Sequence, residues 1–233
     1  MSPPYEGVSE IMSDYTTVAK VGEIPEGRGK AYDVGNKTVA VFNDGGQYYA
    51  IDKKTGSLDW AYSSFGGLPD SAAGVIWKDM YICRTNGELC GLDLDTGEMY
   101  WSFRDPREGR GKTVMNSTPS NSGDRTFVST SIDHDGAALG ATLYCIDNST
   151  GKELWHYTGA GGWTGSSCTE ETVICGSSTE SFVTCLDVKG HPDGTPKIIW
   201  RTKIGGILEE TIPAISGNMA YLLCTDGYLY AFK

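Results

Sequence analysis

Arginine and lysine recur two residues apart in two copies of the pentapeptide EGRGK, at residues 26–30 and 108–112. A tryptophan and a pair of glutamates stand in comparable glycine-flanked connections further along the chain. The seven candidate ligand-binding residues are Arg28, Lys30, Arg110, Lys112, Trp163, Glu209 and Glu210. Cationic groups beside an aromatic ring can receive an anionic ligand or a sugar. The alternative is a solvated rim that binds nothing.

Three aspartates begin the pattern Asp-x-x-Thr-Gly, at Asp52, Asp93 and Asp147. Such a loop could hold a cation. However, an aspartate also accepts hydrogen bonds from the amides of a turn, and glycine supplies the positive φ that a turn needs. We therefore predict tight turns here and no metal site.

Other catalytic patterns are missing from the sequence. The three histidines are His134, His156 and His191, and no Cys/His spacing suits zinc. There is neither a Ser/His/Asp arrangement nor a phosphate loop of the G-x-x-x-x-G-K-[ST] type. His156 follows Trp155 on an expected outer strand, which favours a surface position. We predict no catalytic residues.

The charge and hydropathy pattern limits the partners. A net charge of −11 and a pI near 4.7 disfavour nucleic acids and anionic membranes. No apolar run is long enough to span a membrane, so we expect no membrane insertion. The N-terminus lacks the pattern of a signal peptide. We expect a cytoplasmic protein, or a periplasmic or extracellular one whose signal peptide has been removed.

The candidate binding residues and the turn aspartates lie within a sequence repeat of 40–50 residues, which must set their positions. Four segments share an apolar strand, an acidic turn with glycine and a closing tryptophan: 48–60, 89–101, 143–155 and 183–200. Their tryptophans, Trp60, Trp101, Trp155 and Trp200, are 41, 54 and 45 residues apart. The chain ends in LYAFK, the start of a fifth copy. This period with short strands is typical of propeller blades.

Each unit is interpreted as four antiparallel strands. Between residues 71 and 103 these are SAAGVIW, MYICR, LCGLD and MYWSF, with a hairpin turn at Asn86-Gly87. Other copies place Gly45-Gly46 or Asp226-Gly227 at the hairpin.

The third strands of the units align column by column. One column is small (Ala50, Gly91, Cys145, Cys185, Ala231) and its neighbour is large and apolar (Ile51, Leu92, Ile146, Leu186, Phe232). Both faces of each sheet should therefore be buried, as in stacked blades. We expect the small column to let the next blade approach closely.

The cysteines fit this pattern as packing residues. Cys145 and Cys185 occupy the small column. Cys83 and Cys90 flank the Asn86-Gly87 turn symmetrically and should face each other, either as a disulfide or, as we favour, as two reduced thiols. Seven cysteines is an odd number, which favours a reducing compartment.

Counting strands gives five blades. The units are 29–60, 61–105, 112–157, 163–203 and 207–233, and the fifth lacks its outer strand. Alignment of the two EGRGK copies places residues 18–21 on Tyr100–Phe103. We therefore predict an all-β, five-bladed propeller, with a flexible tail over 1–14 and one domain over 15–233. In this domain the segment 15–24 completes the last blade.

The pattern Y-x-x-D…T-G…W after an apolar hairpin resembles the PQQ-like β-propeller repeat family. That family includes quinoprotein dehydrogenases, the outer-membrane assembly lipoprotein of the β-barrel machinery, and sensor or surface proteins. The dehydrogenases bind pyrroloquinoline quinone (PQQ) and Ca²⁺ and carry a vicinal disulfide. This chain has no adjacent cysteines and about half their length, so their functional residues cannot be transferred.

Residues 12–52 also resemble the opening strands of a Rieske-type ferredoxin domain. That family needs C-x-H and C-x-x-H ligands, and none of the histidines lies in either motif. We expect no iron–sulfur cluster. The leading hypothesis is a non-catalytic module that binds partner proteins. The alternatives are a propeller that binds a sugar or an anion and a PQQ-dependent redox protein.

Overall fold

The structure is a computed structural model. It describes residues 28–34, 37–43, 47–51, 58–63, 74–85, 88–106, 112–115, 117–134 and 137–233. Every regular element in these ranges is a β-strand, labelled β1 to β20 in chain order. The prediction of an all-β protein is confirmed for the described residues.

The repeat chosen for the sequence interpretation forms one antiparallel sheet in chain order. Its strands are β5 (Val75–Trp77), β6 (Met80–Thr85), β7 (Glu88–Asp93) and β8 (Met99–Arg104). The second, third and fourth predicted strands are recovered to within one residue at each end. The first is confirmed over Val75–Trp77, since residues 71–73 of its predicted range, like Asn86-Gly87, lie outside the described residues. Cys83 pairs directly with Cys90, as the symmetry of the hairpin predicts, and both thiols are free.

Three further sheets repeat this order. The second contains β10 (Ser120–Ser122), β11 (Arg125–His134), β12 (Ala137–Asp147) and β13 (Glu153–Thr158), with β9 (Lys112–Met115) beside β11. The third contains β14 (Ser166–Cys168), β15 (Thr172–Cys175), β16 (Phe182–Asp187) and β17 (Ile198–Lys203). The last contains β18 (Ala214–Ser216), β19 (Met219–Leu223) and β20 (Leu229–Phe232).

The first predicted blade is not assembled as one sheet. Its strands are β1 (Arg28–Val34), β2 (Lys37–Asn43), β3 (Gln47–Ile51) and β4 (Leu58–Ser63). They form two separate two-stranded sheets, β1–β2 and β3–β4. The turn predicted at Gly45-Gly46 and the closing segment 15–24 both lie outside the described residues. The count of five blades and the N-terminal closure therefore stay predictions.

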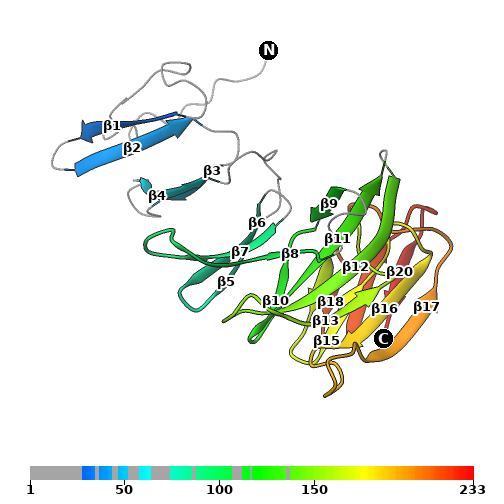
Figure 1. The fold of residues 1–233 in the computed structure, drawn as a ribbon. Helices are drawn as coiled ribbons and strands as arrows, with labels where there is room; N and C mark the ends of the chain where they lie inside the picture. Colours follow the sequence, from blue (N-terminus) through cyan, green and yellow to red (C-terminus); the bar gives the residue numbers. More distant parts are fainter. Residues whose placement is uncertain are drawn as a thin grey trace, which may run out of the picture.

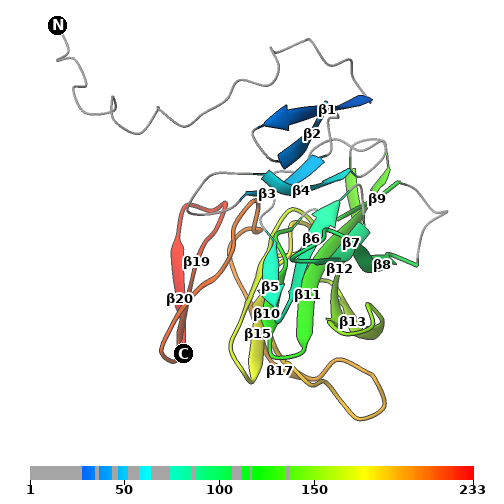
Figure 2. The same cartoon turned by 90° about the vertical axis from the view of Figure 1, so that its left-hand side faces the viewer.

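The sheets are arranged around their shortest strands. β10 contacts β5 on one side and β14 on the other, and β14 contacts β18. Between β10 and β14 the hydroxyl groups of Ser120 and Ser166 lie 2.9 Å apart. Figures 1 and 2 show these sheets following one another from β5 to β20, with β1–β2 on the side away from β20. First strands that meet along an axis, with sheets stacked face to face, are the arrangement of a β-propeller.

A regular interface joins neighbouring sheets through the repeat tryptophans. In three of the four repeat tryptophans the indole Nε1 donates a hydrogen bond to the carbonyl oxygen that follows the turn aspartate of the next sheet. The pairs are Trp60 to Leu94 at 2.7 Å, Trp101 to Asn148 at 2.8 Å and Trp155 to Val188 at 3.3 Å. The same rings lie against the turn glycines of the next sheet, which are Gly97, Gly151 and Gly190. The tryptophan and the glycine of the repeat are therefore two halves of one contact.

The small column of the third strands has a local cause. The small residue pairs with the tryptophan of its own sheet, as in Gly91 with Trp101 and Cys145 with Trp155. A Cβ atom at Gly91 would lie 2.6 Å from Cε2 of Trp101. The column thus leaves room for an indole ring within the same sheet, whereas close approach of the next blade was the expected reason.

Candidate functional site

The four basic candidates lie at the start of strands or before them. Arg28 and Lys30 belong to β1 and Lys112 begins β9. Their side chains and the whole of Arg110 lie outside the described part of the chain. A site that depends on these four groups stays a prediction.

The other three candidates come together. Trp163, Glu209 and Glu210 line one pocket of about 520 Å³, and Thr225 completes its lining. Trp163 belongs to the connection between β13 and β14, and the two glutamates belong to the connection between β17 and β18. Thr225 lies in the β19–β20 hairpin and was not among the sequence candidates. Hairpin tips vary between the repeats, so the sequence carried no signal for it.

Backbone hydrogen bonds hold the two sides of this pocket together. The amide of Glu210 donates to the carbonyl oxygen of Trp163 at 2.9 Å. The hydroxyl of Thr164 donates to the carbonyl oxygen of Thr211 at 2.5 Å. Glu210 adopts a left-handed backbone conformation, with φ of 49°. A side chain rarely adopts this conformation without support from its surroundings, and the bond to Trp163 gives that support.

A second pair of contacts fixes the hairpin side. The amide of Ile207 donates to the Thr225 hydroxyl oxygen at 3.0 Å, and the amide of Thr225 donates to the carbonyl oxygen of Ile207 at 3.1 Å. The side chains that face the pocket are therefore carried on a braced frame of three connections. The Thr225 hydroxyl is already bonded to both backbone groups of Ile207. The indole ring and the two carboxylates can bind a hydroxyl-rich ligand or a cation.

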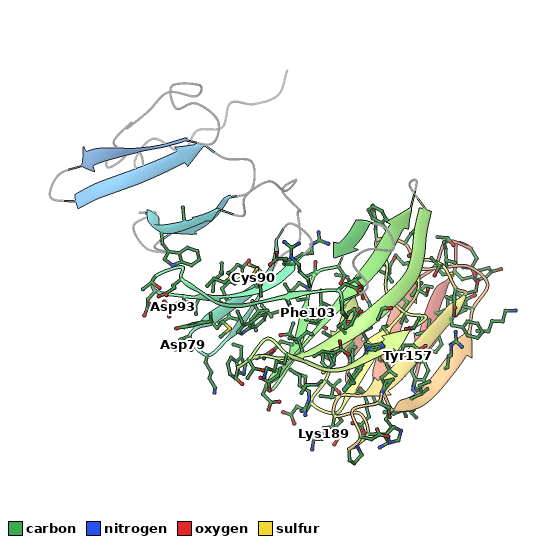
Figure 3. The ribbon with its side chains drawn as sticks, in the orientation of Figure 1. Asp79, Cys90, Asp93, Phe103, Tyr157 and Lys189 are labelled. Atoms are coloured by element: carbon green, nitrogen blue, oxygen red, sulfur yellow. The ribbon has the colours of Figure 1, made fainter. Side chains whose placement is uncertain are left out.

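The Asp-x-x-Thr-Gly loops are turns, as the sequence predicts. Oδ1 of Asp93 accepts hydrogen bonds from the amides of Asp95 and Thr96, and the φ of Gly97 is 72°. Asp147 binds its own turn in the same way. Asp52 lies outside the described residues. Figure 3 places Asp93 at the edge of the β5–β8 sheet.

The turn also controls the ionisation of Asp93. Hydrogen bonds from the Tyr100 hydroxyl and from Thr96 lower the pKa of Asp93 to about 2. Burial raises the pKa of Asp147, but the hydrogen bonds from Ser149 and Thr150 outweigh it, so that pKa lies below its ordinary value. The carboxylates of Asp93 and Asp147 therefore stabilise their own turns as ionised hydrogen-bond acceptors.

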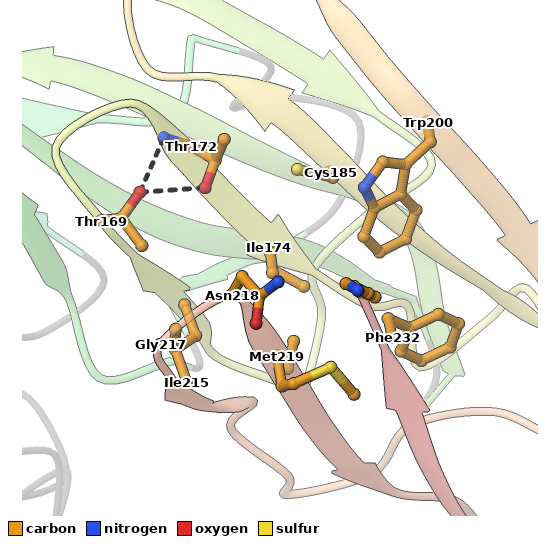
Figure 4. A pocket seen from close by; sticks show the side chains of 12 residues that line it. Thr169, Thr172, Ile174, Cys185, Trp200, Ile215, Gly217, Asn218, Met219 and Phe232 are labelled. Carbon is orange, nitrogen blue, oxygen red and sulfur yellow. Dashed lines mark hydrogen bonds between the residues drawn. The ribbon is translucent and has the colours of Figure 1, made fainter.

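A second, more apolar hollow lies between the last two sheets. Its volume is about 170 Å³, and Trp200, Phe232, Ile174 and Met219 are among its lining residues. Figure 4 shows the rings of Trp200 and Phe232 on one side of it. Their centroids are 5.3 Å apart with nearly parallel planes. Carbon and sulfur atoms make up most of its walls, so the hollow could hold an apolar group but has few polar atoms that could bind or react with a ligand.

The histidines lie apart from the pocket. His156 is on β13, where its Nδ1 lies 2.6 Å from Oε1 of Glu153. His191 is exposed in the turn before β17, and the side chain of His134 is outside the described part. Among the described residues, no three His, Cys, Asp or Glu side chains form a group that could hold a metal ion. The same residues include no helix of the length and apolarity needed to cross a membrane.

Comparison with known proteins gives one family. A family model described as outer membrane protein assembly factor BamB matches residues 16–232. The outer membrane protein assembly factor BamB of Burkholderia pseudomallei (strain K96243) is 26% identical over 208 residues, which cover 84% of this chain and 50% of that protein. The quinoprotein ethanol dehydrogenase of Pseudomonas putida is 27% identical over 143 residues, which cover 52% of this chain and 22% of the enzyme. The chain thus spans half or less of these curated relatives.

A solved structure supports the fold. The quinohemoprotein alcohol dehydrogenase from Comamonas testosteroni superposes with a TM-score of 0.63 at 15% identity. The superposition covers 79% of this chain and 38% of the enzyme. At this identity the likeness shows the β-propeller fold alone.

Proposed function

The chain belongs to the family described as outer membrane protein assembly factor BamB, and from this membership we propose that it is a non-catalytic β-propeller module that binds partner proteins. The observation that carries the proposal is the family match, which runs through all the described strands from β1 to β20. Stacked sheets joined by buried indole rings make a rigid body, and such a body can present loops to a partner with little loss of entropy. By analogy with the outer membrane protein assembly factor that it resembles, we propose that it acts at the outer membrane.

Purification from the native source tests this proposal. We expect a complex with a fixed stoichiometry that survives size-exclusion chromatography and is identified by mass spectrometry. An isolated monomer that turns over an alcohol substrate would overturn the proposal. The matched control is a chain of the same length with Gly151→Val, in which the Trp101 contact is blocked. It should lose the complex because the sheets no longer stack.

A second candidate is a small-ligand function at the pocket of Trp163. The observation that favours it is the exposure of this indole, 48%, on a braced wall. A glycan array with Trp163→Ala tests it, with Tyr100→Ala as the control because Tyr100 is a similarly exposed aromatic residue on β8. A sugar bound by the control variant but not by Trp163→Ala would support this function. An array without any hit would remove it.

PQQ chemistry has weaker support. The dehydrogenase relative is a quinoprotein by name, but the described residues offer no cluster of metal-binding side chains, and the sequence has no adjacent cysteines. These residues do not fit a PQQ–Ca²⁺ site. Addition of PQQ and Ca²⁺ should leave the melting temperature and the visible spectrum unchanged.

A further inference from the structure

The pocket of Trp163 has an uneven charge. Two of its lining side chains, Glu209 and Glu210, are acidic and exposed, and none of the described residues that line it is basic. The whole chain adds to this field with its net charge of −11. Such a pocket attracts cations and repels anions.

The exposed indole ring adds a second recognition element. The face of a tryptophan ring attracts a positive group placed within about 6 Å of it. The long aliphatic stem of lysine or arginine can also pack on an apolar ring while its charged end stays at the carboxylates. One bound side chain can therefore use the ring and the glutamates together.

The frame of the pocket suits a docking role. The backbone amide of Glu210 is bonded to the backbone carbonyl of Trp163, so the two main-chain positions that carry the carboxylate and the indole ring are held together before any partner arrives. A preformed site avoids part of the ordering cost of association. Two of the three connections that form it, β13–β14 and β17–β18, link one sheet to the next, and the third is the β19–β20 hairpin of the last sheet, so the pocket exists only when neighbouring sheets are correctly stacked.

We propose that the pocket of Trp163, Glu209 and Glu210 is the docking point for a lysine- or arginine-bearing segment of a partner protein. The inference rests on the proposed scaffold function and names the surface and the chemistry through which it acts. Charge complementarity selects this occupant over a second copy of the chain, because two bodies of charge −11 repel each other.

The chain supplies a matched comparison. Glu170 and Glu171 are also adjacent and exposed, but they lie beside Lys189 and no aromatic ring lines their hollow. Two neighbouring glutamates alone should therefore bind a basic segment weakly. The comparison separates the effect of the Trp163 pocket from the effect of the overall negative charge.

Fluorescence anisotropy of a labelled tetra-lysine peptide tests the proposal on the full chain. We expect saturable one-to-one binding that weakens as salt is added. Glu209→Gln with Glu210→Gln should weaken it roughly three- to tenfold, and Trp163→Leu roughly two- to fivefold. Glu170→Gln with Glu171→Gln should leave it unchanged, and a tetra-acetyl-lysine peptide should not bind.

Each other outcome overturns the inference. Equal losses in both double variants would mean attraction by net charge alone. Equal binding of putrescine and the peptide would make this a small-molecule site, and binding of neutral oligosaccharides that survives the Gln changes would make it a sugar site. A peptide that does not bind would exclude this surface, while the scaffold proposal would still be decided by isolation of the native complex.

Discussion

At the residue scale, neighbouring repeats are held together by the contact between the tryptophan of one sheet and the turn glycine of the next. The buried indole of Trp101 donates to a backbone carbonyl of the next sheet and lies against Gly151. Position 151 requires glycine for two reasons: its φ is 67°, and a Cβ atom there would lie 2.6 Å from the ring. Only the first of these roles could be predicted from the turn pattern of the sequence.

Gly151→Ala should therefore destabilise more than the same change at a turn glycine that lacks the ring. Gly123 is the matched control, since its φ is 58° and a Cβ atom added there would meet no atom within 4 Å. Gly123→Ala should cost roughly 1–2 kcal/mol from the left-handed conformation. Gly151→Ala should cost about 1–3 kcal/mol more from overpacking. Urea unfolding measures both, and equal losses would show that the ring contact is unimportant.

The loss of stability in acid is also determined by single residues. The folded pKa of Asp93 is about 2, below the value of about 3.9 expected in the unfolded chain. Its contribution to stability is complete above pH 4 and is lost as the pH falls through 2. Asp93→Asn should flatten the fall of melting temperature between pH 4 and pH 2. Asp95→Asn, in the same turn, should keep the parental slope; an unchanged slope for Asp93→Asn would refute the assignment.

At the element scale, the sequence predicted the strands well and their irregularities poorly. Short apolar runs separated by turn residues locate β5 to β8, because these are local properties of the chain. The register shift between Gly91 and Leu92, repeated between Cys145 and Ile146, was not predicted. A bulge places two residues of one strand opposite one residue of its partner, and the residue pattern of a single strand does not show where that happens.

The candidate site shows the same division. Trp163, Glu209 and Glu210 could be selected because they lie in connections between repeats. Their meeting in one pocket depends on how two sheets stack, and Thr225 joins them only through the hairpin of the last sheet. Sequence spacing contains neither fact.

The two cysteines that face each other across the β6–β7 hairpin allow a test of its burial. Cys83 and Cys90 are both buried, and burial raises the pKa of the Cys83 thiol to about 12. Both should resist alkylation at pH 8 in the folded protein and react after unfolding, whereas the partly exposed Cys224 should react first. Peptide mass spectrometry after iodoacetamide labelling measures the order. A mass lower by two hydrogens in the peptides of Cys83 and Cys90 would show a disulfide instead.

At the scale of the whole molecule, the stability of each sheet depends on the sheets beside it. β16 is buried along most of its length, since it is covered by neighbours on both faces and paired on both edges. β20 alternates between exposed and partly buried residues, and no described strand pairs with its outer edge. In a stacked array each sheet gains its stability from its neighbours, so the sheets need not open together.

Hydrogen exchange should therefore follow this order. The amides of β16 should exchange only through near-global opening, whereas those of β20 should exchange through local opening at a lower free energy. The internal control is β7, which carries the same pattern of burial as β16 in a different sheet and should match its protection. Mass spectrometry of peptides that cover these strands measures the rates. Equal protection of β20 and β16 would mean that the outer edge of β20 is covered in solution, and it would favour the predicted closure of the ring by residues 15–24.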